Sequence, residues 1–229
     1  MTCIAIIPAR GGSKGIPNKN LAEVGGQSLV TRAINSAVQS GVVDVVVVSS
    51  DDLTILEAAA NAGAIAIRRP ADLATDTAAI EDAIAHALQK FSESHPTPTT
   101  LVLLQPTSPL RQASSISDAV LLFNENGSVG SVYGVIEAEH HPYKTFIAND
   151  STLLPVGSIE DLSRSRHELP KAYRQSGSIY VVGVQDFLTS NSLHISPVRW
   201  IEVGQEEAID VDTPADLEAV RQAARNANA

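Results

Sequence analysis

The sequence has 229 residues and a formal net charge of −10 at pH 7. Hydrophobic residues make up 44% of it and charged residues 18%, which excludes global disorder and predicts one large globular domain or a domain with an insertion. The acidic balance disfavours nucleic-acid binding, because phosphates require a basic face. A local basic cleft can nevertheless bind an anionic substrate in an acidic protein. We therefore expect no nucleic-acid partner.

Two features of the sequence suggest the cellular compartment of the protein. Cys3 is the only cysteine, so no intramolecular disulfide can form, and its position in an apolar run predicts a buried, inert thiol. No apolar stretch reaches the roughly 18 residues of a membrane span, and no cationic leader precedes the first apolar run. The expectation is a cytoplasmic protein without a membrane partner.

The first half of the chain alternates between two hydrophobic patterns. Short apolar runs predict strands at residues 3–7, 45–48, 64–67 and 101–104. Helical spacing predicts helices at about 30–38, 53–60 and 80–91, the last with Thr75 or Asp76 as its N-cap. This alternation predicts an α/β fold with an open, mostly parallel, Rossmann-like sheet flanked by helices. Ligands bind such sheets at the carboxyl ends of the strands, where segments 10–20 and 105–111 are expected.

The second half is less regular. Residues 136–176 contain loop-like and hairpin-like segments, and their apolar content is too low for a separate core. We interpret them as an insertion in a single domain spanning residues 1–229, with the sheet resuming at 178–182. Near the end, Thr213 as N-cap, Pro214 and Asp216 predict the start of a last helix.

A glycine-rich loop follows the first predicted strand. Residues 10–20 include three glycines, three cations and a hydroxyl, namely Gly11, Gly12, Gly15, Arg10, Lys14, Lys19 and Ser13. Closely approaching backbone N–H groups and compensating charge suit a polyphosphate. Neither the dinucleotide fingerprint nor the Walker motif is present, which disfavours hydride-transfer enzymes and P-loop ATPases. The alternative is a tight turn whose cations merely lie on the surface.

Two carboxylates are spaced one residue apart near the C-terminal helix. Asp210 and Asp212 share one face if the segment is extended, and they repel unless a cation lies between them. Oxygen ligands suit Mg²⁺ or Mn²⁺, and Mg²⁺ typically binds one or two carboxylates plus substrate phosphates. The alternative is that Asp212 assists the helix start while Asp210 is solvated.

The insertion is locally basic. A short stretch carries several cations around Glu168, namely Arg164, Arg166, His167, Lys171 and Arg174, with Lys144 upstream. Arginine pairs suit the binding of carboxylates or phosphates, and a solvated surface loop is an equally good interpretation of this charge content. His140 and His141 are adjacent and lack the spacing of metal ligands.

Six ordered motifs resemble those of the acylneuraminate cytidylyltransferases, or CMP-sialic acid synthetases. They are residues 7–20, 69–77, 104–111, 140–144, 166–174 and 209–214. Together they extend through nearly the whole chain. The resemblance implies a nucleotidyltransferase-type fold and Mg²⁺-dependent transfer of CMP from CTP to a nine-carbon 2-keto sugar acid, with release of pyrophosphate.

The resemblance also assigns residues. It implies nucleotide contacts at Arg10, Ser13, Lys14, Lys19, Asn20 and Arg69. It implies sugar contacts at Gln105, Thr107, Lys144, Arg166, Arg174 and Tyr180, some of them delivered across a homodimer interface by the insertion. Asp210 and Asp212 resemble the metal-binding pair, and the expected catalytic residues are Lys19, Arg10 and Asp212.

Several positions depart from the family pattern. The chain has Arg166-His167-Glu168 where family members often have R-x-Q or R-Q-Q. It has Ser176-Gly-Ser-Ile-Tyr180 where they usually have N-G-A-I-Y, and Leu193-His194 where some members have aromatic residues near the acyl group of the sugar. These changes leave the reaction type intact but open the identity of the sugar, with legionaminic and pseudaminic acids as alternatives to sialic acid. A Kdo-type or other sugar nucleotidyltransferase and a catalytically silent binding protein are the competing hypotheses.

Overall fold

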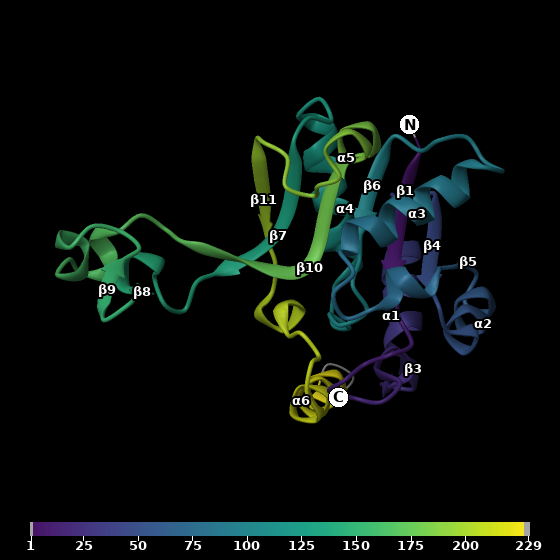
Figure 1. The fold of residues 1–229 in the computed structure, drawn as a ribbon, viewed down its shortest axis with the longest axis horizontal. Coiled ribbons are helices and arrows are strands. Elements are labelled where there is room, and N and C mark those ends of the chain that lie inside the picture. Colours follow the sequence, from purple (N-terminus) through teal and green to yellow (C-terminus); the bar gives the residue numbers. More distant parts are fainter. Residues whose placement is uncertain (1, 227–229) are drawn as a thin grey trace.

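The computed structural model describes residues 2–226 and is built on one seven-stranded sheet (Figure 1). The strand order is β11-β7-β10-β6-β1-β4-β5. The strands are β1 (Cys3–Pro8), β4 (Val45–Ser50), β5 (Ile65–Arg68), β6 (Thr100–Leu103), β7 (Ser131–Glu137), β10 (Tyr173–Gly183) and β11 (Val198–Glu202). Every pairing is parallel except those of β10 with β6 and β7. The predicted open, mostly parallel sheet is confirmed.

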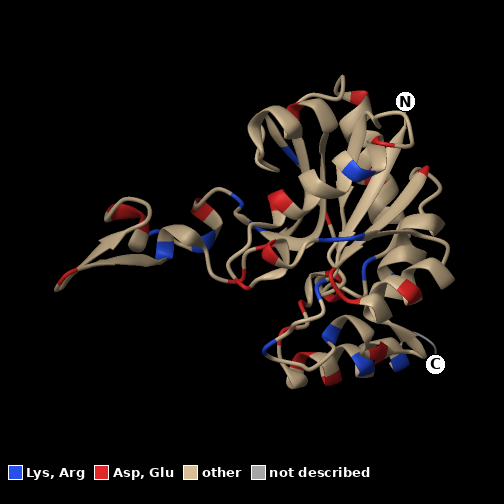
Figure 2. Ribbon diagram, turned by 45° about the vertical axis from the view of Figure 1, so that its right-hand side comes forward, with Lys and Arg blue, Asp and Glu red and all other residues tan. Residues whose placement is uncertain are grey.

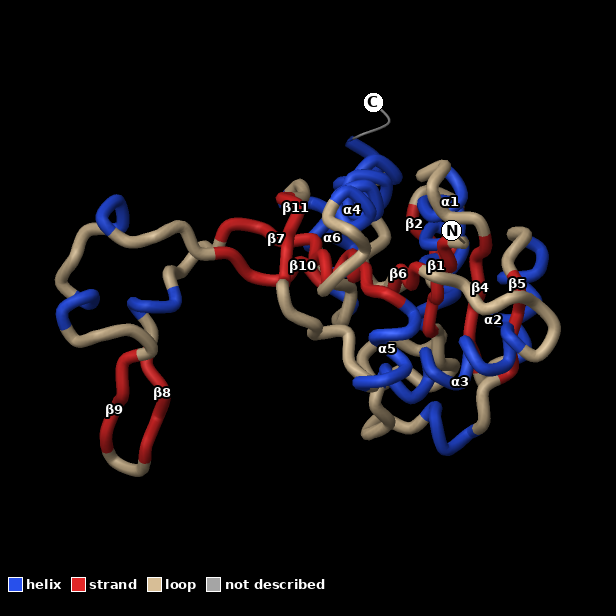
Figure 3. The backbone as a smooth tube through the Cα atoms, turned by 90° about the horizontal axis from the view of Figure 1, so that it is seen from above, coloured by secondary structure: helices blue, strands red, loops and turns tan. Residues whose placement is uncertain are grey.

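Helices cover both faces of this sheet (Figure 3). They are α1 (Leu29–Gln39), α2 (Leu53–Asn61), α3 (Ile80–Ser92), α4 (Ala113–Glu125), α5 (Val184–Ser190) and α6 (Pro214–Asn226). Apolar residues of α1, α2 and α4 pack on one face, and those of α3 and α5 pack on the other. Val46, Val47 and Val48 of β4 are therefore buried between the two helix layers, as a run without polar alternation predicts, and Val45 is half-buried.

The C-terminal helix packs away from the main sheet layers. Helix α6 lies beside a small hairpin of β2 (Glu23–Val24) and β3 (Gln27–Ser28), with Val24, Leu217 and Val220 in a shared apolar cluster. The Thr213 N–H donates to Asp216 Oδ2 at 2.7 Å, and the Asp216 N–H donates to Thr213 Oγ1 at 3.3 Å. The predicted helix start at Thr213 is confirmed by this reciprocal cap.

The insertion forms an arm that projects from the sheet (Figure 1). The arm, residues 138–172, connects β7 to β10. It contains a hairpin of β8 (Phe146–Asn149) and β9 (Thr152–Pro155) and short 3-10 turns at Pro142–Lys144, Glu160–Leu162 and Arg166–Glu168. Strand β10 begins at Tyr173 rather than at residue 178, because its polar first residues pair with β7.

Two local expectations are corrected or completed. The N-cap of α3 is Ala79, not Thr75 or Asp76, because Thr75 already ends the 3-10 turn Ala71–Ala74.

Cys3 is buried, and burial together with the nearby Asp44 charge raises the pKa of its thiol to about 12, so the thiol is inert as predicted. Among the described residues, no helix is long and apolar enough to cross a bilayer.

Candidate active site

A cavity of about 370 Å³ lies at the carboxyl ends of β1, β5 and β6. Its walls come from four separate segments of the chain, residues 8–20, 69–80, 105–107 and 210–212. The predicted site residues among its lining are Arg10, Lys19, Asn20, Arg69, Gln105, Thr107, Asp210 and Asp212. Ligands bind at this edge of a parallel α/β sheet, so the fold brings eight predicted residues together where a substrate is expected.

The glycine-rich loop is fixed by its own protein contacts. The buried Asn20 donates from Nδ2 to the Arg10 carbonyl at 2.8 Å, and the Gly11 N–H donates to Asp51 Oδ1 at 3.0 Å. A Cβ on Gly15 would overlap the carbonyl oxygen of Asp212. The absence of a side chain at Gly15 therefore lets this loop touch the segment that carries the paired aspartates.

Arg69 forms a buried part of the cavity wall. Its side chain is only 6% exposed, and its Nε and Nη2 have no hydrogen-bond partner among the described residues. Burial lowers its pKa, while the charge of Asp51 raises it and that of Arg10 lowers it. Buried donors without acceptors are costly, so this guanidinium fits a ligand rich in oxygen acceptors.

An acidic residue holds the loop cations at the rim. Asp76 Oδ1 lies 2.6 Å from Arg10 Nη1, and its Oδ2 lies 2.6 Å from Lys14 Nζ. These hydrogen bonds hold the pKa of Asp76 below its ordinary value. Ser13 and Lys14 line a shallower depression with Asp76 beside the main cavity. A carboxylate thus neutralises two cations that we predicted to contact the nucleotide.

Asp210 and Asp212 line the cavity, and Asp212 lies next to Lys19 of the glycine-rich loop. Lys19 Nζ donates to Asp212 Oδ1 at 2.9 Å. Burial raises the pKa of Asp210, a Thr107 hydrogen bond lowers it, and the Asp212 charge raises it. The mutual repulsion of two carboxylates at one cavity wall fits a divalent cation.

The donor set for such a cation is small. No group of three or more His, Cys, Asp or Glu side chains with metal-binding geometry occurs in residues 2–226. Two carboxylates with the remaining positions left to water and phosphate fit Mg²⁺. The residues present therefore fit the predicted ion.

The β6 end supplies the neutral polar wall. Gln105 and Thr107 line the cavity, and the Thr107 carbonyl accepts the Val211 N–H at 2.8 Å, which ties this wall to the aspartate segment. Tyr180 lies on β10 outside the lining, where burial, Tyr133 and the Asp210 charge all raise its pKa. It packs edge-on against Tyr133 with ring centroids 5.3 Å apart.

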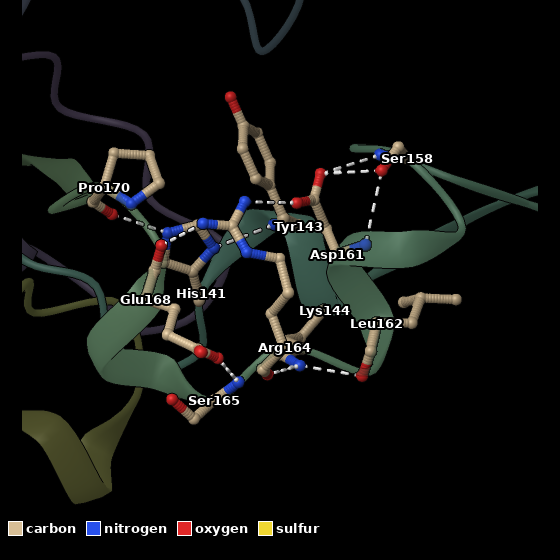
Figure 4. Close-up of polar contacts among 10 residues, drawn as sticks. All are labelled: His141, Tyr143, Lys144, Ser158, Asp161, Leu162, Arg164, Ser165, Glu168 and Pro170. Carbon is tan, nitrogen blue, oxygen red and sulfur yellow. Dashed lines mark hydrogen bonds and ion pairs between the residues drawn. The ribbon is translucent and has the colours of Figure 1, made fainter.

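The arm residues do not reach this cavity within one chain. Lys144 Nζ donates to the Leu162 and Arg164 carbonyls inside the arm (Figure 4). Arg166 lines a separate depression at the arm's base, and Arg174 is exposed on β10. Basic and acidic positions are intermixed along the arm (Figure 2), and Arg164 pairs with Asp161 at 2.9 Å.

A family model described as cytidylyltransferase matches residues 4–202. The chain belongs to the cytidylyltransferase family. It is therefore a nucleotidyltransferase, as its motifs indicated, and the matched residues include both the sheet and the arm.

Relatives of this cytidylyltransferase carry related names. It is 33% identical over 219 residues to a CMP-N,N'-diacetyllegionaminic acid synthase of Legionella pneumophila, covering 94% of this chain and 93% of that one. It is 30% identical over 221 residues to an N-acylneuraminate cytidylyltransferase of Streptococcus agalactiae, covering 95% of this chain but 52% of that one. A solved CMP:2-keto-3-deoxy-manno-octonic acid synthetase complexed with CTP shares the fold, with a TM-score of 0.73, 18% identity and coverage of 99% and 100%.

Sequence reasoning missed two residues near the cavity. Asp76 and Arg111 both lie in motifs that were recognised, but only Arg69, Gln105 and Thr107 of those motifs received a role. Their contacts join segments distant in sequence, so local spacing carries no signal for them. Position within a ligand-binding motif is the signal that could have drawn attention to them.

Proposed function

We propose that this cytidylyltransferase transfers CMP from CTP to the anomeric hydroxyl of a nonulosonic acid and releases pyrophosphate. The observation that carries the proposal is the single cavity in which loop cations, a buried unpaired guanidinium and paired aspartates face neutral polar groups of the β6 end. The names of the relatives, which include legionaminic and N-acylneuraminic acid enzymes, supply the acceptor class.

Basic and neutral polar residues bind different parts of the nucleotide. Arg10, Ser13 and Lys14 at the rim, with Asn20 and Arg69 deeper in the cavity, bind CTP. Bound phosphates replace the Asp76 carboxylate as partners of the rim cations. Because contacts of Asn20 and Asp51 with the loop backbone fix its course, the nucleotide meets a loop backbone that is already in place.

The chemistry is an in-line substitution at the α-phosphorus. The sugar's anomeric oxygen forms the new P–O bond while the bond to pyrophosphate breaks, and the hydroxyl proton leaves to solvent or a base. Lys19 Nζ, half-buried beside Asp212, offsets the negative charge that grows on the α-phosphate. Gln105, Thr107 and Tyr180 hold the sugar acid for attack.

Asp210 and Asp212 are the residues that would hold Mg²⁺, with Mn²⁺ as the alternative. When bound, such an ion polarises phosphate oxygens and lowers the charge barrier to attack. The Asp212 carboxylate also keeps Lys19 oriented toward the reacting end of the cavity.

The arm completes the sugar site of a second copy. Its hairpin exposes Phe146, Ile147, Leu153 and Leu154, and Trp200 is 55% exposed on the outer strand β11. Apolar side chains gathered on a projecting arm and on a sheet face are typical of an interface. A homodimer would cover them and bring Lys144, Arg166 and Arg174 to the neighbouring cavity.

The test is pyrophosphate release from CTP with a panel of sialic, legionaminic and pseudaminic acids and Kdo, each repeated with ATP, GTP and UTP. Release with CTP and one nine-carbon acid, dependent on Mg²⁺, is the expected result. Turnover of Kdo alone, or of another nucleotide, would contradict the proposed acceptor or base. No release from folded, metal-replete protein with any member would favour a silent binding protein.

A further inference from the structure

We propose that Arg111 is a positioning residue that sets the width of the sugar half of the cleft. It does so by bridging the Gln105 carbonyl, just beyond the end of β6, and the Ser178 carbonyl, in the bulge of β10 two residues before Tyr180. This inference rests on the proposed function, because the side chains of Gln105 and Tyr180 are the ones assigned to the sugar acid.

The Arg111 side chain is enclosed by protein. It is 6% exposed, Nε donates to the Ser178 carbonyl at 2.6 Å, and Nη2 donates to the Gln105 carbonyl at 2.6 Å. Burial lowers its pKa to about 10, so the guanidinium stays charged at neutral pH. A buried charge with two short bonds to backbone carbonyls is a rigid link between the two segments that carry them.

The two carbonyls belong to strands that have stopped pairing. The ladder between β6 and β10 ends at the pair Leu103 and Tyr180, and β10 then bulges through Gly177, whose φ is +78°. Beyond that pair, Gln105 and Ser178 have carbonyl groups that cannot bond to each other, since both are acceptors. The forked guanidinium supplies the donors and joins the two segments beyond their last paired residues.

A buried carboxylate, Glu207, links the segment that carries Asp210 and Asp212 to the residues that follow Arg111. Glu207 is 5% exposed and accepts hydrogen bonds from the Gln112 N–H at 2.9 Å, Ser115 Oγ at 3.0 Å and the Gly204 N–H at 3.1 Å. Its charge raises the pKa of Arg111 against the effect of burial. Since Glu207 shortly precedes Asp210 in the chain, the wall with the aspartates is tied to the helix that follows Arg111.

Arg32 provides a matched control. It is also partly buried, and it donates from Nε to the Pro109 carbonyl at 2.8 Å and from Nη1 to the Val24 carbonyl at 3.3 Å. Neither acceptor belongs to a residue of the cavity lining. Its loss therefore removes a comparable backbone bridge without moving the sugar wall.

The experiment compares Arg111→Lys with Arg32→Lys, with separate KM values for CTP and for the accepted sugar acid. A lysine ammonium cannot span both carbonyls as the fork does, so Arg111→Lys should raise the sugar KM about tenfold or more and change the CTP KM less than about twofold. Arg32→Lys should lower the melting temperature and leave both KM values unchanged. Equal losses for both substrates, or the same pattern in both variants, would overturn the proposal.

Gly177→Ala tests the bridge should Arg111→Lys not fold. A Cβ there meets no atom within 4 Å, but the positive φ strains the bulge that aims the Ser178 carbonyl. A smaller rise in the sugar KM, with the CTP KM unchanged, is expected, and no rise would contradict the bridge. Turnover by the wild-type enzyme separates the two hypotheses. If the wild type turns over a nonulosonic acid but the variants do not raise the sugar KM selectively, only the bridge is refuted. If the wild type turns over no nonulosonic acid, the proposed function is refuted and the bridge with it.

Discussion

The cavity and the arm differ in how far one chain determines them. Around the cavity, predicted residues from four segments converge, because the carboxyl ends of parallel strands meet at one edge of the sheet. In the arm, Lys144 and Arg166 face other arm residues or a separate depression. Residues at a sheet edge are placed by the fold of their own chain, whereas residues on a projecting arm need a second surface to act on. The predictions below test this division.

The largest effect is expected within the cavity. Lys19→Ala should reduce kcat for pyrophosphate release by about 10²–10³-fold, because it removes the cation nearest the paired aspartates and the reacting phosphate. Lys14→Ala is the control, since that side chain is 81% exposed and pairs with Asp76 at the rim. It should raise the CTP KM by less than about tenfold with little change in kcat. Equal effects of the two substitutions would contradict the distinction between cavity and rim.

The next effect concerns pH and the paired aspartates. Because the pKa of Asp210 is raised in the folded state, the carboxyl takes up a proton at a higher pH than an exposed aspartate does. The concentration of Mg²⁺ needed for half-maximal activity should therefore rise as pH falls through that raised pKa. Titrating the rate with Mg²⁺ at several pH values measures this, and a constant requirement would contradict the assignment.

The same shift has a stability consequence. A raised pKa means that the fold disfavours ionised Asp210, so the resulting loss of stability is complete above the folded pKa and vanishes below the unfolded one. Asp210→Asn should accordingly raise the melting temperature of metal-free protein at neutral pH only slightly, because Asp210 is exposed and solvent screens its charge. The gain should shrink as pH falls through the folded pKa. A lower melting temperature at neutral pH would show that the carboxylate is stabilising instead.

The smallest effect is expected at the rim. Asp76→Asn removes the carboxylate that competes with phosphate for Arg10 and Lys14, so the CTP KM should fall by about two- to threefold. The exposed pairs are weak, and kcat should not change. An increase in KM would mean that Asp76 serves to hold the loop in its binding conformation rather than to compete with the ligand.

The sequence allowed prediction of the first half of the fold and most of the cavity. Apolar runs such as 45–48 and helical spacing at 30–38 are strong signals, because each element buries its apolar side chains on the common core. Helix α4, α5, β7 and β11 were not predicted. The polar first half of β10 was missed because a strand that leaves the core to support an arm does not need apolar residues.

The remaining site features depend on tertiary contacts. The sequence places Arg111 in a recognised motif without a role of its own, and the fold buries it where carbonyls from two distant segments accept its hydrogen bonds. The partnership of Asp76 with Arg10 likewise spans loops that only the folded sheet brings together. Local patterns identify which residues a site uses, and the fold decides which of them meet within one chain.

Mixing inactive variants tests most directly whether cavity and arm belong to different copies. Neither Lys19→Ala nor Arg166→Ala should turn over CTP and the sugar acid well alone, but after subunit exchange their mixture should recover about a quarter of the wild-type sites, one intact site per mixed dimer. Lys19→Ala mixed with Asp212→Ala, both in the same cavity, should recover none. Absence of recovery with Arg166→Ala, despite demonstrated exchange, would show that the arm does not complete a partner's site.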